Sequence, residues 1–79
     1  MEMRMELSTY KAEQIEAIMK LEEDIGTAKS LGVRLFHHNL DGTQVDITAE
    51  YEARQQQILA SMKRALRFIE EQIAKAGKL

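Results

Sequence analysis

The chain has 79 residues, of which 44% are hydrophobic and 30% charged, and its formal net charge is −2. This composition is too apolar for an intrinsically disordered chain, and its uncharged runs are too short for a span of roughly 20 apolar residues across a bilayer. The lack of cysteine excludes disulfides, thiol catalysis and cysteine-rich zinc sites, and the slightly acidic total argues against general nucleic-acid binding.

A chain of this length is expected to form one small domain over residues 1–79. Domains this small bury only about 60% of the surface that the unfolded chain exposes, so they often need cross-links, metal ions or oligomerisation. With no cysteine and two histidines, we expect no metal and no cofactor, and we favour oligomerisation. Residues 1–7, MEMRMEL, lack the apolar core of a signal peptide, so a cytoplasmic location is expected.

The first long segment is predicted to be a helix over about residues 8–31. Ser8 or Thr9 can cap its start, and apolar residues then recur at helical spacing. Gly32 is placed to end the helix in the left-handed conformation. Residues 1–7 alternate apolar and charged side chains, which permits a short edge strand, an extension of the helix or a disordered start.

Residues 33–47 are predicted to form either a short β-hairpin or an irregular loop. Strand-favouring residues flank Asp41-Gly42, the preferred residue pair of a two-residue type I′ turn. The hairpin with this turn pairs Leu40 with Thr43, His38 with Val45, His37 with Asp46 and Phe36 with Ile47. This register gathers the apolar residues on one face, which supports it.

The last third of the chain, residues 48–76, is predicted to be one long helix that Thr48 caps. Its apolar residues form two adjacent lines, so its apolar face is wider than the seam of a simple coiled coil. We therefore expect the helix to contact both the first helix and a second chain. The predicted oligomer interface consists of Ile58, Leu59, Met62, Leu66, Phe68, Ile69 and Ile73.

Together these elements predict a mainly α fold. Two antiparallel helices form a hairpin joined by the short β-hairpin, and two copies are expected to dimerise into a four-helix bundle.

The compact basic cluster Lys63, Arg64 and Arg67 is the candidate ligand-binding site. Spacings of three and four residues place these like charges together on the helix surface. They indicate either an ordinary solvated helix face or a site for an anionic ligand or an acidic partner.

His37 and His38, with Asp41 and Asp46, are the only neighbouring group of metal-ligating or acid–base side chains in the sequence. Neighbouring residues of a strand point to opposite faces, so the two histidines cannot easily share an ion. We predict ordinary pairing and packing for them, with no metal site and no catalytic residue.

Two stretches resemble known phage proteins. Residues 33–47 followed by the helix from Thr48 are similar in plan to small head–tail joining proteins of tailed phages, although both helices here are longer than that plan needs. EEDIGTAK and SMKRALRFIEEQIAK resemble the helical hairpin of phage proteins that sequester nucleotide immune signals. The Ser-Arg-Glu turn and Met-Trp pair of those proteins are missing, with Arg67-Phe68 where the pair would stand, so no family is assigned.

No phosphate-binding loop, dinucleotide-binding turn or nucleophile with a placed base occurs in the sequence, so we do not expect an enzyme. The predicted function is that of a non-catalytic homo-oligomer, an assembly adaptor or inhibitor whose partners are itself and another protein. The alternative is an oligomer that sequesters an anionic small ligand such as a nucleotide at Lys63, Arg64 and Arg67. Neither prediction involves a membrane.

Overall fold

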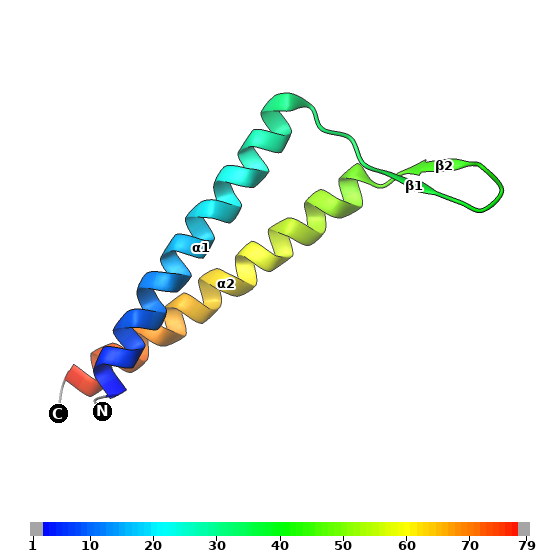
Figure 1. Cartoon of the computed structure of the whole chain (residues 1–79). Helices are drawn as coiled ribbons and strands as arrows, with labels where there is room; N and C mark the ends of the chain where they lie inside the picture. The colour runs from blue at the N-terminus through cyan, green and yellow to red at the C-terminus, as the bar shows by residue number, and fades with distance from the viewer. Residues whose placement is uncertain (1–2, 78–79) are drawn as a thin grey trace.

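The computed structural model describes residues 3–77 and shows two long helices joined by a small antiparallel sheet (Figure 1). The elements follow in the order α1 (Met3–Leu31), β1 (Phe36–His38), β2 (Gln44–Asp46) and α2 (Thr48–Gly77). The predicted helical hairpin with a short β-hairpin between its helices is confirmed.

The start of α1 lies before the predicted residue 8 and agrees, over residues 3–7, with the alternative of a helix extension. The helix begins at Met3, so Ser8 and Thr9 lie inside it and neither stands at its start. Residues 3–7 are Met, Arg, Glu and Leu, which are strong helix formers and extend the helix past the two hydroxyl residues. The strand alternative is therefore wrong for residues 3–7, and residues 1–2 lie outside the described residues.

The end of α1 is the predicted left-handed glycine. Gly32 has a φ of +66°, and its N–H donates to the Lys29 carbonyl at 3.2 Å. The next N–H, that of Val33, reaches back to the Ala28 carbonyl at 3.0 Å. This pair of bonds is a Schellman motif, which satisfies carbonyls that the end of the helix leaves without partners.

The β-hairpin exists, but its predicted register is wrong by one residue. The structure pairs Phe36 with Asp46, His37 with Val45 and His38 with Gln44. Asn39 N–H donates to the Thr43 carbonyl at 2.9 Å, so Leu40 joins the loop and is fully exposed. Because the side-chain period of a strand is two, this shift places Phe36 and Val45 on opposite faces.

A three-residue loop replaces the predicted two-residue turn. A type I′ turn needs positive φ at both central residues, but only Gly42 has it here, at +88°. The Asp41 carboxylate accepts from the Thr43 N–H at 2.9 Å and from the Thr43 hydroxyl at 2.7 Å. These side-chain bonds stabilise the longer loop, in which a single left-handed glycine suffices.

The start of α2 at Thr48 is confirmed, but Thr48 does not cap the helix. Asp46 Oδ1 accepts from the Thr48 N–H at 2.9 Å, so the carboxylate supplies the acceptor for the first turn. The Thr48 hydroxyl oxygen instead accepts from the Leu35 N–H at 2.9 Å. One threonine thus ties the connecting segment to the first turn of α2.

Partial burial recurs along both helices at alternating spacings of three and four residues, the pattern of an antiparallel coiled-coil seam. We call this set of residues the helix seam. On α1 it comprises Leu7, Lys11, Gln14, Ile18, Leu21, Ile25 and Ala28. On α2 it comprises Gln55, Leu59, Met62, Leu66, Ile69, Ile73 and Ala76.

Polar contacts along the seam set the alignment of the two helices. Gln14 Nε2 donates to the Met62 carbonyl at 3.3 Å, Lys11 Nζ lies 3.6 Å from Glu70 Oε2, and Lys63 Nζ lies 3.2 Å from Glu22 Oε2. Ion pairs this exposed contribute at most about 1 kcal/mol each. They favour one antiparallel alignment, while the apolar seam residues supply most of the attraction.

The buried core is small for a chain of this length. Among the described residues only Ile18 and Leu59 are buried, with 6% and 7% of their surface exposed. The radius of gyration is 18.2 Å, against about 12 Å for a compact domain of this size. The accessible surface is 6465 Å², about 1,600 Å² above the value expected for a folded monomer of this mass.

Candidate functional site

The residues predicted to form the oligomer interface divide into two sets. Five of them lie in the helix seam: Leu59, Met62, Leu66, Ile69 and Ile73. Ile58 and Phe68 lie outside the seam and are 43% and 61% exposed. The contact with α1 therefore covers residues of both predicted apolar lines and leaves Ile58 and Phe68 outside it in the single chain.

Ile58 and Phe68 belong to a continuous line on the surface of α2. We define the α2 outer stripe as Tyr51, Arg54, Ile58, Ser61, Ala65, Phe68 and Gln72. Gln72 is half-buried and the other six residues are exposed. At about 100° per residue, the stripe lies about 90° around α2 from the helix seam. A helix in a four-helix bundle presents two contact lines with a separation of this order.

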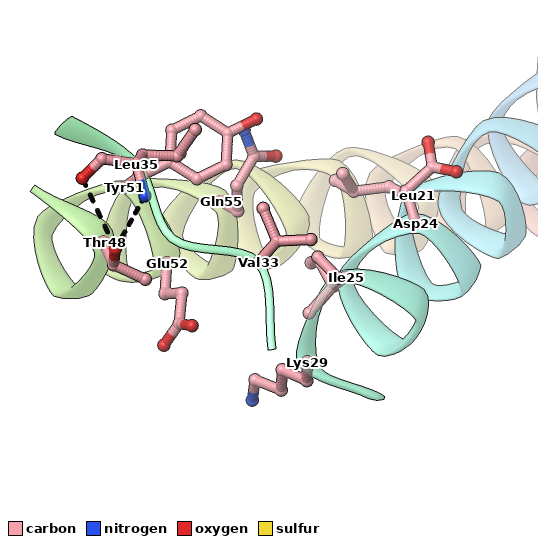
Figure 2. Close-up of a pocket in the computed structure, with 11 residues that line it drawn as sticks. Leu21, Asp24, Ile25, Lys29, Val33, Leu35, Thr48, Tyr51, Glu52 and Gln55 are labelled. Atoms are coloured by element: carbon pink, nitrogen blue, oxygen red, sulfur yellow. Dashed lines mark hydrogen bonds between the residues drawn. The ribbon is translucent and has the colours of Figure 1, made fainter. Parts of the chain in front are cut away.

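A second apolar feature lies where the two helices diverge, at the end of the molecule that carries the β-hairpin (Figure 1). A cleft of about 140 Å³ opens there between α1, the connecting segment and the start of α2 (Figure 2). Its apolar lining comprises Leu21, Ile25, Ala28, Val33, Leu35 and Tyr51, and its charged lining comprises Asp24, Lys29 and Glu52. Tyr51 belongs to both the cleft and the α2 outer stripe.

The cleft was not predicted, because it depends on how far the helices diverge. Hydrogen bonds between Thr48 and the backbone of Leu35 close its hairpin end (Figure 2). A volume near 140 Å³ accommodates about one large apolar side chain or a ligand of the size of benzene.

The structure brings together the three residues of the predicted anion site. Lys63, Arg64 and Arg67 line one shallow surface depression, together with Ile18, Ala60 and Leu66. Two of the cations already have partners within the chain. Lys63 pairs with Glu22 at 3.2 Å, and Arg64 donates to the Ser61 hydroxyl at 3.0 Å. A bound anion would have to compete with Glu22 for Lys63.

The β-hairpin separates the polar residues that were predicted to pair. His37 stands opposite Val45 and Asp46 stands opposite Phe36, so the predicted pair of His37 with Asp46 is wrong. Within residues 3–77, no group of three or more His, Asp or Glu side chains is arranged to hold a metal ion.

Both carboxylates of this region are held by local bonds. Asp46 accepts from the Thr48 hydroxyl at 2.5 Å and from the Thr48 N–H at 2.9 Å, and it also pairs with Arg34. These bonds favour the charged form and lower the pKa of Asp46 to about 2, with Thr48 the largest cause. Hydrogen bonds from Thr43 likewise lower the pKa of Asp41. Both groups are therefore charged at neutral pH and fix the chain geometry.

Comparisons with protein-family models, curated proteins and solved structures returned no match. Neither helix of the described residues has the length and apolar character needed to cross a bilayer.

Proposed function

We propose that this chain is a non-catalytic interaction protein that works as a homo-oligomer. In the proposed assembly, two helical hairpins dimerise into a four-helix bundle. The oligomer then acts as an adaptor in an assembly, the kind of role that the resemblance to head–tail joining proteins implies, or as an inhibitor of another protein.

The observation that carries the proposal is the large solvent-accessible surface of the single chain, compared with that of a compact monomer of the same mass. Among the described residues, Ile18 and Leu59 alone are buried, and the accessible surface exceeds the monomer expectation by about 1,600 Å². A standard protein interface covers about 800 Å² on each partner. The excess is large enough for one such interface and leaves further surface for a different protein.

Native mass spectrometry of freshly purified protein tests this function. The expected result is a species with two or more times the 9.1 kDa chain mass. A strictly monomeric mass, together with cooperative unfolding at low concentration, would contradict the proposal.

A second candidate function is the sequestration of an anionic small ligand at Lys63, Arg64 and Arg67. Its support is the single depression that the three side chains line. The substitution Arg67→Glu should abolish retention of such a ligand in the same mass spectrum while helicity and subunit number stay unchanged. Lys20→Glu makes the same charge change on α1, outside the depression, and is the matched control. Ligand that survives Arg67→Glu would mean that the site lies elsewhere.

A further inference from the structure

The two flanks of α2 beside the helix seam differ in charge. Between residues 55 and 74, one flank carries Lys63, Arg67 and Glu70. The other flank is the α2 outer stripe, which has no charged residue of its own over the same range, although Arg64 donates to its Ser61 at 3.0 Å and Lys75 follows it. An exposed line of four helical turns without charge is typical of a surface that another protein covers.

The uncharged part of the α2 outer stripe is also complementary to itself. Ser61 lies near its middle, with Ile58 on one side and the small Ala65 on the other. If a second α2 lies antiparallel with a two-fold axis near Ser61, each Ile58 meets the other copy's Ala65. The same alignment places Tyr51 beside the other copy's Gln72. An isologous contact uses the same patch on both copies, so each of these residue pairs occurs twice across the axis.

Charge at the ends of the stripe fits the same alignment. Arg54 comes directly before the uncharged range and would lie beside Phe68 of the other copy. An arginine over an aromatic face makes a favourable cation–π contact. Phe68 is 61% exposed in the single chain, so this contact would cover an aromatic ring that α1 leaves uncovered.

The equivalent line on α1 is a weaker candidate. It contains exposed Ile15 and Met19, but Glu22 interrupts it and is already paired with Lys63. A second copy on this line would bury a charged pair, whereas the α2 outer stripe offers a longer uncharged surface.

We propose that the α2 outer stripe is where a second copy of this chain docks, antiparallel and with its two-fold axis near Ser61. This inference rests on the proposed homo-oligomeric function and specifies the face, the direction and the axis of the contact. The excess surface of about 1,600 Å² for the whole chain is about twice what a standard interface takes from one partner.

Cysteine cross-linking tests the inference directly, because the natural chain has no cysteine. Two α-carbons must approach within about 7 Å for a disulfide to form, which a residue beside the two-fold axis satisfies. Under mild oxidation, the Ser61→Cys variant should form a covalent dimer at least about tenfold faster than the Ser30→Cys variant. Ser30 is the matched control, since it is an exposed serine on α1 outside the stripe.

A mixture of two variants tests the direction of the helices. Ile58→Cys mixed with Ala65→Cys should give cross-linked heterodimers, while Ile58→Cys alone should cross-link slowly because its two copies lie on either side of the axis. Fast cross-linking of Ile58→Cys alone would mean parallel helices and would overturn the inference.

The outcomes separate this inference from the proposed function. A dimer in native mass spectrometry with equal cross-linking rates for Ser61→Cys and Ser30→Cys would refute the docking face and leave the homo-oligomer standing. A monomer in both measurements would refute both.

Discussion

At the residue scale, Asp46 has the largest number of structural roles in the connecting segment. One carboxylate provides the acceptor for the first turn of α2, accepts from the Thr48 hydroxyl and pairs with Arg34. The sequence predicted a partner for this aspartate but assigned it to His37 across the hairpin. In the structure Asp46 instead accepts hydrogen bonds from Thr48, two positions later, as is common for an aspartate before a helix.

The pH dependence of stability follows from these bonds. The folded-state pKa of Asp46 is about 2, below its value of roughly 3.9 in an unfolded chain. Its contribution to stability is therefore present above about pH 4 and is lost as pH falls toward 2. We predict that Asp46→Asn lowers the thermal midpoint at neutral pH and that the difference from the natural protein shrinks below pH 4.

Circular dichroism melts of both proteins across this pH range check the prediction. Glu23→Gln removes an exposed carboxylate from α1 and serves as the control. A difference between Asp46→Asn and the natural protein that stays constant down to pH 2 would show that the carboxylate charge is not what stabilises the folded state.

At the element scale, the sequence predicted the helices better than the hairpin. The two helices follow from apolar periodicity over many turns, and an error at Ser8 moves one boundary without changing the fold. The hairpin register depends on a single choice, whether Leu40 pairs with Thr43 or joins the loop. The hydrogen bonds of Asp41 with Thr43 decide it, and no pattern of apolar residues encodes them.

The candidate interface could also be predicted only in part from the sequence. The sequence identifies the wide apolar face of α2, but Ile58 and Leu59 are neighbours on it and periodicity alone does not say which of them faces α1. In the structure Leu59 is buried and Ile58 is 43% exposed, so Leu59 is the one that lies in the helix seam. The cleft beside Tyr51 was beyond prediction, since it depends on the angle between two helices.

Gly26 inside α1 and Gly32 directly after its end should respond in opposite ways to the same substitution. A Cβ added at Gly26 meets nothing within 4 Å, so Gly26→Ala should stabilise the protein by about 1 kcal/mol through helix propensity. Gly32→Ala also has space, but its φ of +66° should cost about 1–2 kcal/mol. Denaturant melts measure both changes. A loss of stability in Gly26→Ala would mean that another surface approaches Gly26 in solution.

At the scale of the whole molecule, the chain is a rod of 62 × 26 × 18 Å with few residues shielded from water. Its helices pack along one line each, and each keeps a side that nothing in the described chain covers. The proposed dimer would bury more of this exposed surface, because the α2 outer stripe would become a second packed line of the helix. Folding and association are then linked through mass action.

The thermal midpoint should therefore rise with protein concentration. For a dimer of this length, we expect a shift of about 4 °C for each tenfold change in concentration. Ile58→Glu places a charge in the α2 outer stripe and should remove the concentration dependence while the helical signal persists at low temperature. Melts over a hundredfold range of concentration check both expectations. An unchanged midpoint for the natural protein would contradict the coupling of folding to dimerisation.

The positions of the two helix ends have a practical consequence for labelling the protein and for rearranging its chain. The start of α1 and the end of α2 lie at the same end of the molecule, and the β-hairpin lies at the other (Figure 1). A tether or fluorophore on either end of the described chain would therefore stand far from the hairpin and leave it accessible. The same adjacency makes a circular permutant practical, with residues 77 and 3 joined by a short linker and the chain opened in the loop after Asn39. Such a permutant would make α2 the first helix in the chain while keeping the same helix seam.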